Sequence, residues 1–260
     1  MSDWLKRDVP ALKRQVHRVG LAGNFGIDAK TYEAALDAGL NYVFWTPKMR
    51  RVTPVLREAL KRDRESIVVA TGPTFSYFGG SLISGTEKIL RLLNIDYIDV
   101  LQQFWLGKTS AQTEATMEAL HALRDSGKVR LIGTSIHDRP RAGQLARDKT
   151  YDMLMVRYNA AHPGAESDIF PHVDPAHTAV VAYTATRWRK LLKRPRGWTD
   201  RVPTASDCYR FCLSHSAVDL CLMGVASQEQ LTANLSGIEA GPMTGEEMAW
   251  MREFGRVVHG

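Results

Sequence analysis

Two short apolar runs flank a helix-length segment in the middle of the chain, and this arrangement limits what the chain can fold into. The runs are Tyr97 to Gln103 and Val129 to Thr134, which are rich in apolar and β-branched residues and too short for helices. Gly127 closes the helical segment between them. A run that is apolar on both faces is typical of a parallel strand covered by helices, so the unit predicts a parallel sheet.

The same alternation of strand and helix signals recurs along the chain, at a spacing of roughly thirty residues. This count and length favour an α/β fold of the (β/α)8 TIM barrel type over a doubly wound sheet, which usually stops sooner. We expect a single domain over residues 1–260, with an extra C-terminal helix that Thr244 and Glu247 open. Functional groups should then lie just after the strands. The eight predicted strands are residues 18–22, 41–45, 66–70, 97–103, 129–134, 153–158, 178–183 and 220–223.

Composition narrows the class of protein. The chain has 260 residues, 44% of them hydrophobic, without an apolar run long enough to cross a membrane. Residues 1–10 are charged rather than signal-like, so we expect a soluble, cytoplasmic protein that makes no membrane contact. The formal charge is +6, but Arg187 to Arg201 alone carries seven Lys/Arg against one Asp. The basicity is therefore local, and we expect no nucleic-acid partner.

Six segments of the chain resemble the aldo-keto reductases, in order and at the expected spacing. This resemblance implies a barrel that reduces carbonyls with NAD(P)H, so NAD(P) is the expected cofactor. The segments are ALDAGLNY, LLNIDYIDVL, GKVRLIGTS, VRYN, VVAYT and MGVASQEQLTANL.

The family's catalytic tetrad of aspartate, tyrosine, lysine and histidine is not preserved. Aligned on these motifs, the four positions fall on Phe44, Met49, Gly72 and Phe104. None of these groups can transfer a proton, whereas general acid catalysis needs a positioned donor near the carbonyl. The resemblance therefore implies a non-standard active site.

Part of the family's cofactor site is retained. The family's Ser-Asn after the fifth strand is Ser135-Ile136 here, and its strand-six glutamine falls on Met155. The family's basic residue beside the nucleotide-binding turn falls on Ala226, so a contact to a 2′-phosphate is lost there. The sequence therefore does not distinguish NAD from NADP. The capping pattern of Ser227 and Gln230 explains both residues without a ligand, although a helix start also suits a phosphate. The expected cofactor-binding residues are Ser135, Tyr183, Gly224, Ser227, Gln230 and Asn234.

Other polar residues are candidates for a rearranged site. The candidate catalytic residues are Tyr77, His137, Arg157 and His162. Arg157 stands in an apolar strand and needs a partner, which is either a substrate anion or an internal carboxylate. The loop from His162 to His177 holds imidazoles and carboxylates, but their spacing matches no metal motif, so we predict no metal site. The loop from Arg187 to Arg201 could clamp a pyrophosphate or could be a solvated surface.

Three classes of function remain open. The first is an NAD(P)-dependent oxidoreductase that acts on a small carbonyl or alcohol. The second is a lyase, isomerase or hydrolase on the same barrel, and the third is a nucleotide- or metabolite-binding regulatory protein. The oligomeric state is not predicted.

We expect a small-molecule substrate in an apolar pocket at the C-terminal strand ends, lined by Phe44, Trp45, Tyr77, Phe104 and Trp105.

Overall fold

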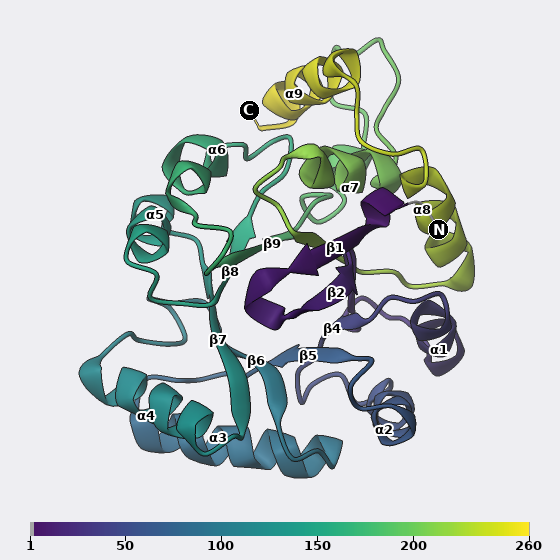
Figure 1. The fold of residues 1–260 in the computed structure, drawn as a ribbon. Coiled ribbons are helices and arrows are strands. Elements are labelled where there is room, and N and C mark those ends of the chain that lie inside the picture. The colour runs from purple at the N-terminus through teal and green to yellow at the C-terminus, as the bar shows by residue number, and fades with distance from the viewer. Residues whose placement is uncertain (1–2, 260) are drawn as a thin grey trace.

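A computed structural model describes residues 3–259. Eight parallel strands close into a barrel in the order β10-β3-β4-β5-β6-β7-β8-β9, which confirms the predicted (β/α)8 architecture (Figure 1). Each predicted strand matches an observed one within about two residues at each end. The strands are β3 (Val19–Ala22), β4 (Tyr42–Phe44), β5 (Val68–Thr71), β6 (Ile98–Gln103), β7 (Val129–Ile136), β8 (Met153–Arg157), β9 (Ala179–Tyr183) and β10 (Leu220–Met223).

Helices cover the outside of the barrel, and local signals set their ends. The Asp28 side chain accepts a hydrogen bond from the Thr31 N–H at 2.7 Å and caps the first helix. Gly39 and Gly127 end two helices with φ of 87° and 75°, a conformation that suits glycine. The helices are α1 (Ala29–Asp37), α2 (Thr53–Arg62), α3 (Gly79–Leu93), α4 (Glu114–Asp125), α5 (Arg139–Arg147), α6 (Ala165–Asp168), α7 (Ala205–Ser214), α8 (Gln228–Ile238) and α9 (Gly245–His259).

Thr53 is the first residue of α2, and its hydroxyl donates to the Met49 carbonyl at 2.9 Å. The stretch from His162 to His177 is not all loop, because α6 and a 3-10 turn at Phe170–His172 lie within it.

Side chains alternate between the barrel interior and the layer under the helices. Along β8, Met153 and Met155 belong to the interior cluster, whereas Leu154 and Val156 pack under the helices. This period of two means that the last inward residue of each strand lines the barrel mouth.

An N-terminal hairpin that the sequence did not predict closes the other end of the barrel. Strands β1 (Lys6–Val9) and β2 (Arg14–His17) pair antiparallel and lie across the barrel opening in Figure 1. Val9 and Val16 are buried and pack on the interior cluster. The described structure thus leaves the C-terminal end of the strands as the uncovered end of the barrel.

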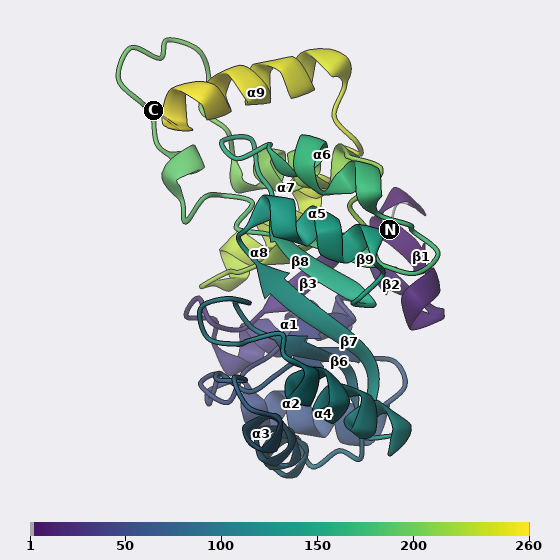
Figure 2. The same ribbon diagram turned by 90° about the vertical axis from the view of Figure 1, so that its left-hand side faces the viewer.

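The loop from Arg187 to Arg201 and α9 form a lobe that projects from the barrel (Figure 2). The rings of Trp198 and Phe254 meet edge to face at 5.0 Å, and the Arg201 guanidinium lies 3.5 Å from the Trp250 ring centroid. The loop is thus packed on α9 in part, rather than solvated throughout.

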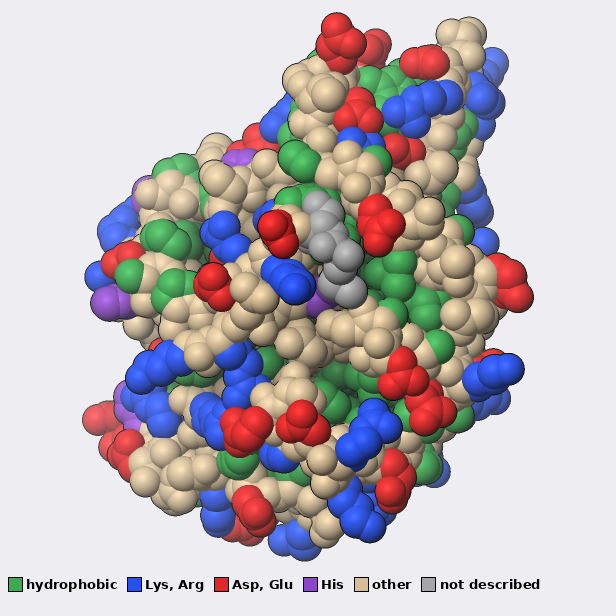
Figure 3. All heavy atoms as spheres, turned by 45° about the vertical axis from the view of Figure 1, so that its right-hand side comes forward, with side chains coloured by type: hydrophobic (Ala, Val, Ile, Leu, Met, Phe, Trp, Pro, Cys, Tyr) green, Lys and Arg blue, Asp and Glu red, His purple; other side chains and the backbone are tan. Residues whose placement is uncertain are grey.

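The surface charge is mixed on one face of the molecule. Basic and acidic side chains are interspersed over the face shown in Figure 3. Within residues 3–259, no helix combines the length and apolar character that a membrane span requires.

Candidate functional site

One half of the barrel mouth is apolar. The rings of Phe44 and Phe104, at the ends of β4 and β6, meet edge to face with centroids 5.5 Å apart. Between them, Gly72 follows β5, and a Cβ added there would lie 2.0 Å from the Gln102 carbonyl oxygen. This backbone therefore has no room for a side chain at the position that the alignment gives to the lysine.

Met49 does not reach the mouth. Its side chain is buried in the outer core, where its sulfur would lie 3.3 Å from a Cβ added at Gly23. The backbone N–H of Met49 donates to the Thr46 carbonyl at 2.9 Å, in the turn before α2. The residue aligned with the family tyrosine is a core residue here.

The other half of the mouth, at the ends of β7, β8 and β9, is polar. Nε2 of His137 lies 2.8 Å from the Tyr183 hydroxyl, and the Trp105 ring lies 5.5 Å from the imidazole. Burial raises the pKa of Tyr183 to about 12, whereas burial and then the Arg157 charge lower the pKa of His137. Both groups are therefore neutral at neutral pH.

Arg157 ends β8 and lies beside Tyr183 in the parallel register of β8 and β9. Its side chain is partly buried. Because strand residues alternate, Arg157 lies on the same inward face of β8 as Met153 and Met155. Its charge contributes to the lowered pKa of His137 and of His162.

The structure does not bring all four candidate catalytic residues together. The Tyr77 hydroxyl donates to the Lys108 backbone carbonyl, and the ring is 40% exposed. The His162 imidazole packs on the ring of His259 at 4.9 Å, and burial together with the Arg157 charge lowers its pKa to about 4. Neither residue forms a hydrogen bond to Tyr183 or His137 within the described part of the chain.

Two further residues near the strand ends carry hydroxyls: Ser135 in β7, and Thr184, which directly follows β9. Ser135 is buried and its Oγ accepts the Trp105 N–H at 2.7 Å, so the hydroxyl still has a proton to donate. The Thr184 Oγ1 is buried without a hydrogen-bond partner among residues 3–259, and Thr184 has a φ of 57°. The sequence does not mark Thr184 as a site residue, because a positive φ at a threonine carries no sequence signal.

The turn after β10 is covered by an aromatic ring. A Cβ added at Gly224 would lie 2.0 Å from Phe25, a half-exposed residue of the loop after β3. Ser227 caps α8 by accepting the Gln230 N–H, but the Gln230 side chain accepts from Ala226 rather than from the cap residue. The expected capping box is therefore formed only in part.

Asn234 is buried on α8. Its amide lies within a weak hydrogen-bond distance, 3.5 Å, of the Met223 sulfur. A direct contact between Asn234 and a nucleotide would thus require this amide to turn outward.

The carboxylates of the loop from His162 to His177 form hydrogen bonds and ion pairs with neighbouring side chains. Glu166 accepts from Tyr158 at 2.6 Å and from Arg252 at 2.8 Å, and Asp168 pairs with Arg139 at 3.0 Å. Within the described chain, no group of three or more His, Cys, Asp or Glu residues could hold a metal.

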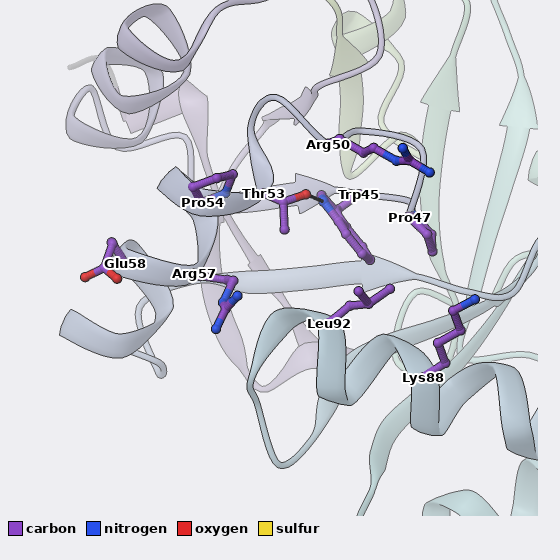
Figure 4. Close-up of a pocket in the computed structure, with 9 residues that line it drawn as sticks. All are labelled: Trp45, Pro47, Arg50, Thr53, Pro54, Arg57, Glu58, Lys88 and Leu92. Carbon is purple, nitrogen blue, oxygen red and sulfur yellow. Dashed lines mark hydrogen bonds between the residues drawn. The ribbon is translucent and has the colours of Figure 1, made fainter.

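One hollow of the described structure lies outside the barrel rather than at its mouth. It is a groove of about 710 Å³ between α2 and α3, and Figure 4 shows the Trp45 ring pointing into it. The expectation that Trp45 lines the mouth is therefore wrong, because Phe44 faces inward and its neighbour must face outward. Lining residues are Trp45, Pro47, Arg50, Thr53, Pro54, Arg57, Glu58, Lys88 and Leu92.

A nicotinamide nucleotide can be tested against these groups. The Tyr183 ring offers an aromatic face, Ser135 a hydroxyl donor, and Thr184 a buried hydroxyl that lacks a partner. The start of α8 offers a positive dipole end for a phosphate. The residues fit the nicotinamide end directly, and they fit the adenosine end once the Phe25 ring moves off Gly224.

The closed barrel, covered by the hairpin at one end and polar at half of its mouth, defines a (β/α)8 protein. A model of the aldo/keto reductase family matches residues 26–195. The chain belongs to this family.

Curated relatives match part of the chain. Methylglyoxal reductase YeaE of Escherichia coli is 30% identical over 165 residues, which are 60% of this chain and 57% of that protein. Aldo-keto reductase YhdN of Bacillus subtilis is 28% identical over 119 residues, 41% of this chain and 36% of that one. The chain thus matches less than two thirds of the length of either relative.

Solved structures match nearly the whole chain. The holo form of aldo-keto reductase AKR11C1 from Bacillus halodurans superposes with a TM-score of 0.80, at 22% identity, over 96% of this chain and 95% of that one. An aldo-keto reductase from Klebsiella pneumoniae in complex with NADPH gives a TM-score of 0.76, at 21% identity and the same coverage. These likenesses show a shared fold.

Proposed function

We propose that this chain is an NAD(P)-dependent oxidoreductase that acts on a small carbonyl or alcohol through a non-standard active site. The observation that carries this proposal is the polar half of the mouth, where Ser135, Tyr183 and Thr184 fit a nicotinamide in a chain that belongs to the aldo/keto reductase family. The Klebsiella relative with bound NADPH supports the choice of cofactor.

The residues of the mouth determine how the reaction is completed. A bound reduced nicotinamide would supply the hydride, and the carbonyl oxygen then needs one proton. Phe44, Gly72 and Phe104 supply none. Of the four candidates, we propose His137 as the donor, because it lies against Tyr183 and beside the half-exposed Trp105 ring. Its lowered pKa leaves little of the protonated form at neutral pH, so turnover should be slow.

A second candidate is a nucleotide-binding protein without catalysis. The apolar ends of β4 to β6 favour it, because three neighbouring inward positions hold no group that can transfer a proton. This candidate predicts NADPH binding without turnover. A lyase, isomerase or hydrolase would instead turn over its substrate without the nucleotide.

The test combines binding with turnover. NADPH is titrated into the purified protein while tryptophan emission is recorded, and NADPH oxidation is then followed with methylglyoxal, a substrate suggested by the name of the Escherichia coli relative. We expect saturable quenching, and turnover ~10²- to 10⁴-fold below that of an enzyme with a positioned acid. Saturable binding with no turnover would favour the second candidate. Absence of both would reject the proposal.

A further inference from the structure

Arg157 is a partly buried guanidinium without a counter-ion. Within residues 3–259, no carboxylate lies within 4.0 Å of it and no acceptor forms a hydrogen bond to it. The two most buried arginines of the chain are satisfied: Arg18 donates to the Leu213 and Val218 carbonyls at 2.8 and 2.7 Å, and Arg210 pairs with Glu247 at 2.7 Å. A partly buried guanidinium that no carboxylate of the described chain neutralises can pair with an anionic group of a ligand.

The neighbours of Arg157 do not neutralise it. His137 and His162 carry little charge at neutral pH because their pKa values are lowered, and the Arg187 charge also acts on His162. The Arg187 guanidinium donates to the Val258 backbone carbonyl, and within residues 3–259 it pairs with no carboxylate. Glu166 and Asp168, the carboxylates after β8, are already paired with other arginines. The mouth above β8 thus has an excess of positive charge.

Exposed aromatic rings lie on loops that follow strands at the C-terminal face. They follow β3, β5, β6 and β9, and with Leu92 and Val257 they are the large apolar side chains that the described structure leaves exposed. Their concentration at one end of the barrel favours a ligand with an apolar body. This aromatic rim consists of Phe25, Phe75, Tyr77, Phe78, Trp105 and Trp188.

We propose that Arg157 binds a carboxylate or phosphate oxyanion of the ligand at the barrel mouth, and that the aromatic rim takes that ligand's apolar body. The proposal rests on the proposed function for the place of the substrate and names its class: an apolar carbonyl compound or alcohol that carries an acidic group. The same oxyanion chemistry is present in the pyrophosphate of a dinucleotide, and the experiment separates the two sources.

The experiment compares Arg157→Gln with Arg57→Gln. Arg57 is a matched control, because it lines the outer groove and pairs with no carboxylate within residues 3–259. Dissociation constants for benzoate, benzyl alcohol and NADPH are measured by calorimetry on wild type and both variants. We expect Arg157→Gln to weaken benzoate binding about tenfold or more, because a charge-assisted hydrogen bond is lost, while benzyl alcohol is unaffected.

A tenfold loss of NADPH affinity in Arg157→Gln, with benzoate affinity unchanged, would support the anion site and identify the dinucleotide as the source of the oxyanion. Unchanged constants for both ligands, equal to those of Arg57→Gln, would overturn the proposal. A wild type that binds benzoate but no NADPH would reject the proposed cofactor and leave the anion site standing.

The unfolding temperature of each variant is measured, to distinguish a loss of binding from a loss of folding. Removing an unpaired charge should leave the unfolding temperature of Arg157→Gln equal to or above that of wild type. If this variant is destabilised, Arg157→Lys keeps the charge and should retain more benzoate affinity than Arg157→Met. Equal loss in the Lys and Met variants would also overturn the proposal, because it would indicate a packing role.

Discussion

The Tyr183 hydroxyl lies 2.8 Å from Nε2 of His137, and this contact joins the end of β9 to the loop after β7. The rings meet nearly edge to face, at 83° and 5.8 Å between centroids. The contact fixes the Tyr183 ring at the mouth, where it can present a face to a ligand.

Two substitutions at Tyr183 separate the ring from the hydroxyl. Tyr183→Phe keeps the aromatic face and loses the bond to His137, so NADPH affinity should change little. Tyr183→Ala should weaken NADPH binding, because stacking of a ring on an aromatic side chain is worth ~1–3 kcal/mol. Titration of tryptophan emission measures both constants. Equal affinities for the Phe and Ala variants would show that the ring is not the contact.

Gly72→Ala should destabilise the barrel. The added Cβ would lie 2.0 Å from the Gln102 carbonyl oxygen, so the backbone of β5 or β6 must shift, at a cost of about 1–3 kcal/mol. Gly80→Ala is the control, because nothing lies within 4 Å of its Cβ and alanine favours the helix. Urea denaturation compares the two. Equal stability would mean that the strand ends have room for a side chain and could admit a lysine.

Asp99 anchors the barrel near its closed end. The carboxylate is buried, with Arg64 at 2.7 Å and the Val69 N–H at 2.9 Å. Asp99→Ala should cost about 3–5 kcal/mol, because it leaves buried donors without a partner. Asp37→Ala, which removes an exposed pair with Arg62 at 3.8 Å, should cost at most about 1 kcal/mol. Similar losses in the two variants would contradict this account.

Stability should fall in acid partly through Glu65. Hydrogen bonds from Arg130 and then Tyr97 lower the pKa of this carboxyl from 4.5 to about 2. Because the folded pKa lies below the unfolded one, the stabilisation is present above pH 4.5 and is lost as pH falls toward 2. Glu65→Gln should flatten the stability profile in that window, and added salt should reduce the difference. If the stability of Glu65→Gln depends on pH as that of wild type does, the acid sensitivity arises from other carboxyls.

The barrel could be predicted because eight strands, buried on both faces, left apolar runs at regular spacing. The hairpin of β1 and β2 could not be predicted, because each strand has four residues and only Val9, Val16 and His17 are buried. Charged residues and Gln15 occupy the other positions, so no apolar period marks the hairpin.

The site was only partly predictable. Inward positions such as Phe44, Phe104 and Tyr183 follow from the strand period, and the same period should have placed Trp45 on the outer face. The ring of Phe25 on Gly224 and the bond from Tyr77 to Lys108 depend on how loops after different strands meet. One sequence carries no signal for such contacts.

A crystal structure of the protein soaked with NADPH tests the central claim most directly. We predict the nicotinamide ring against Tyr183, with its carboxamide near Ser135, the Phe25 ring displaced from Gly224, and the adenosine at the start of α8. Nucleotide bound elsewhere, such as in the groove between α2 and α3, or a mouth that stays empty at saturating NADPH, would contradict it.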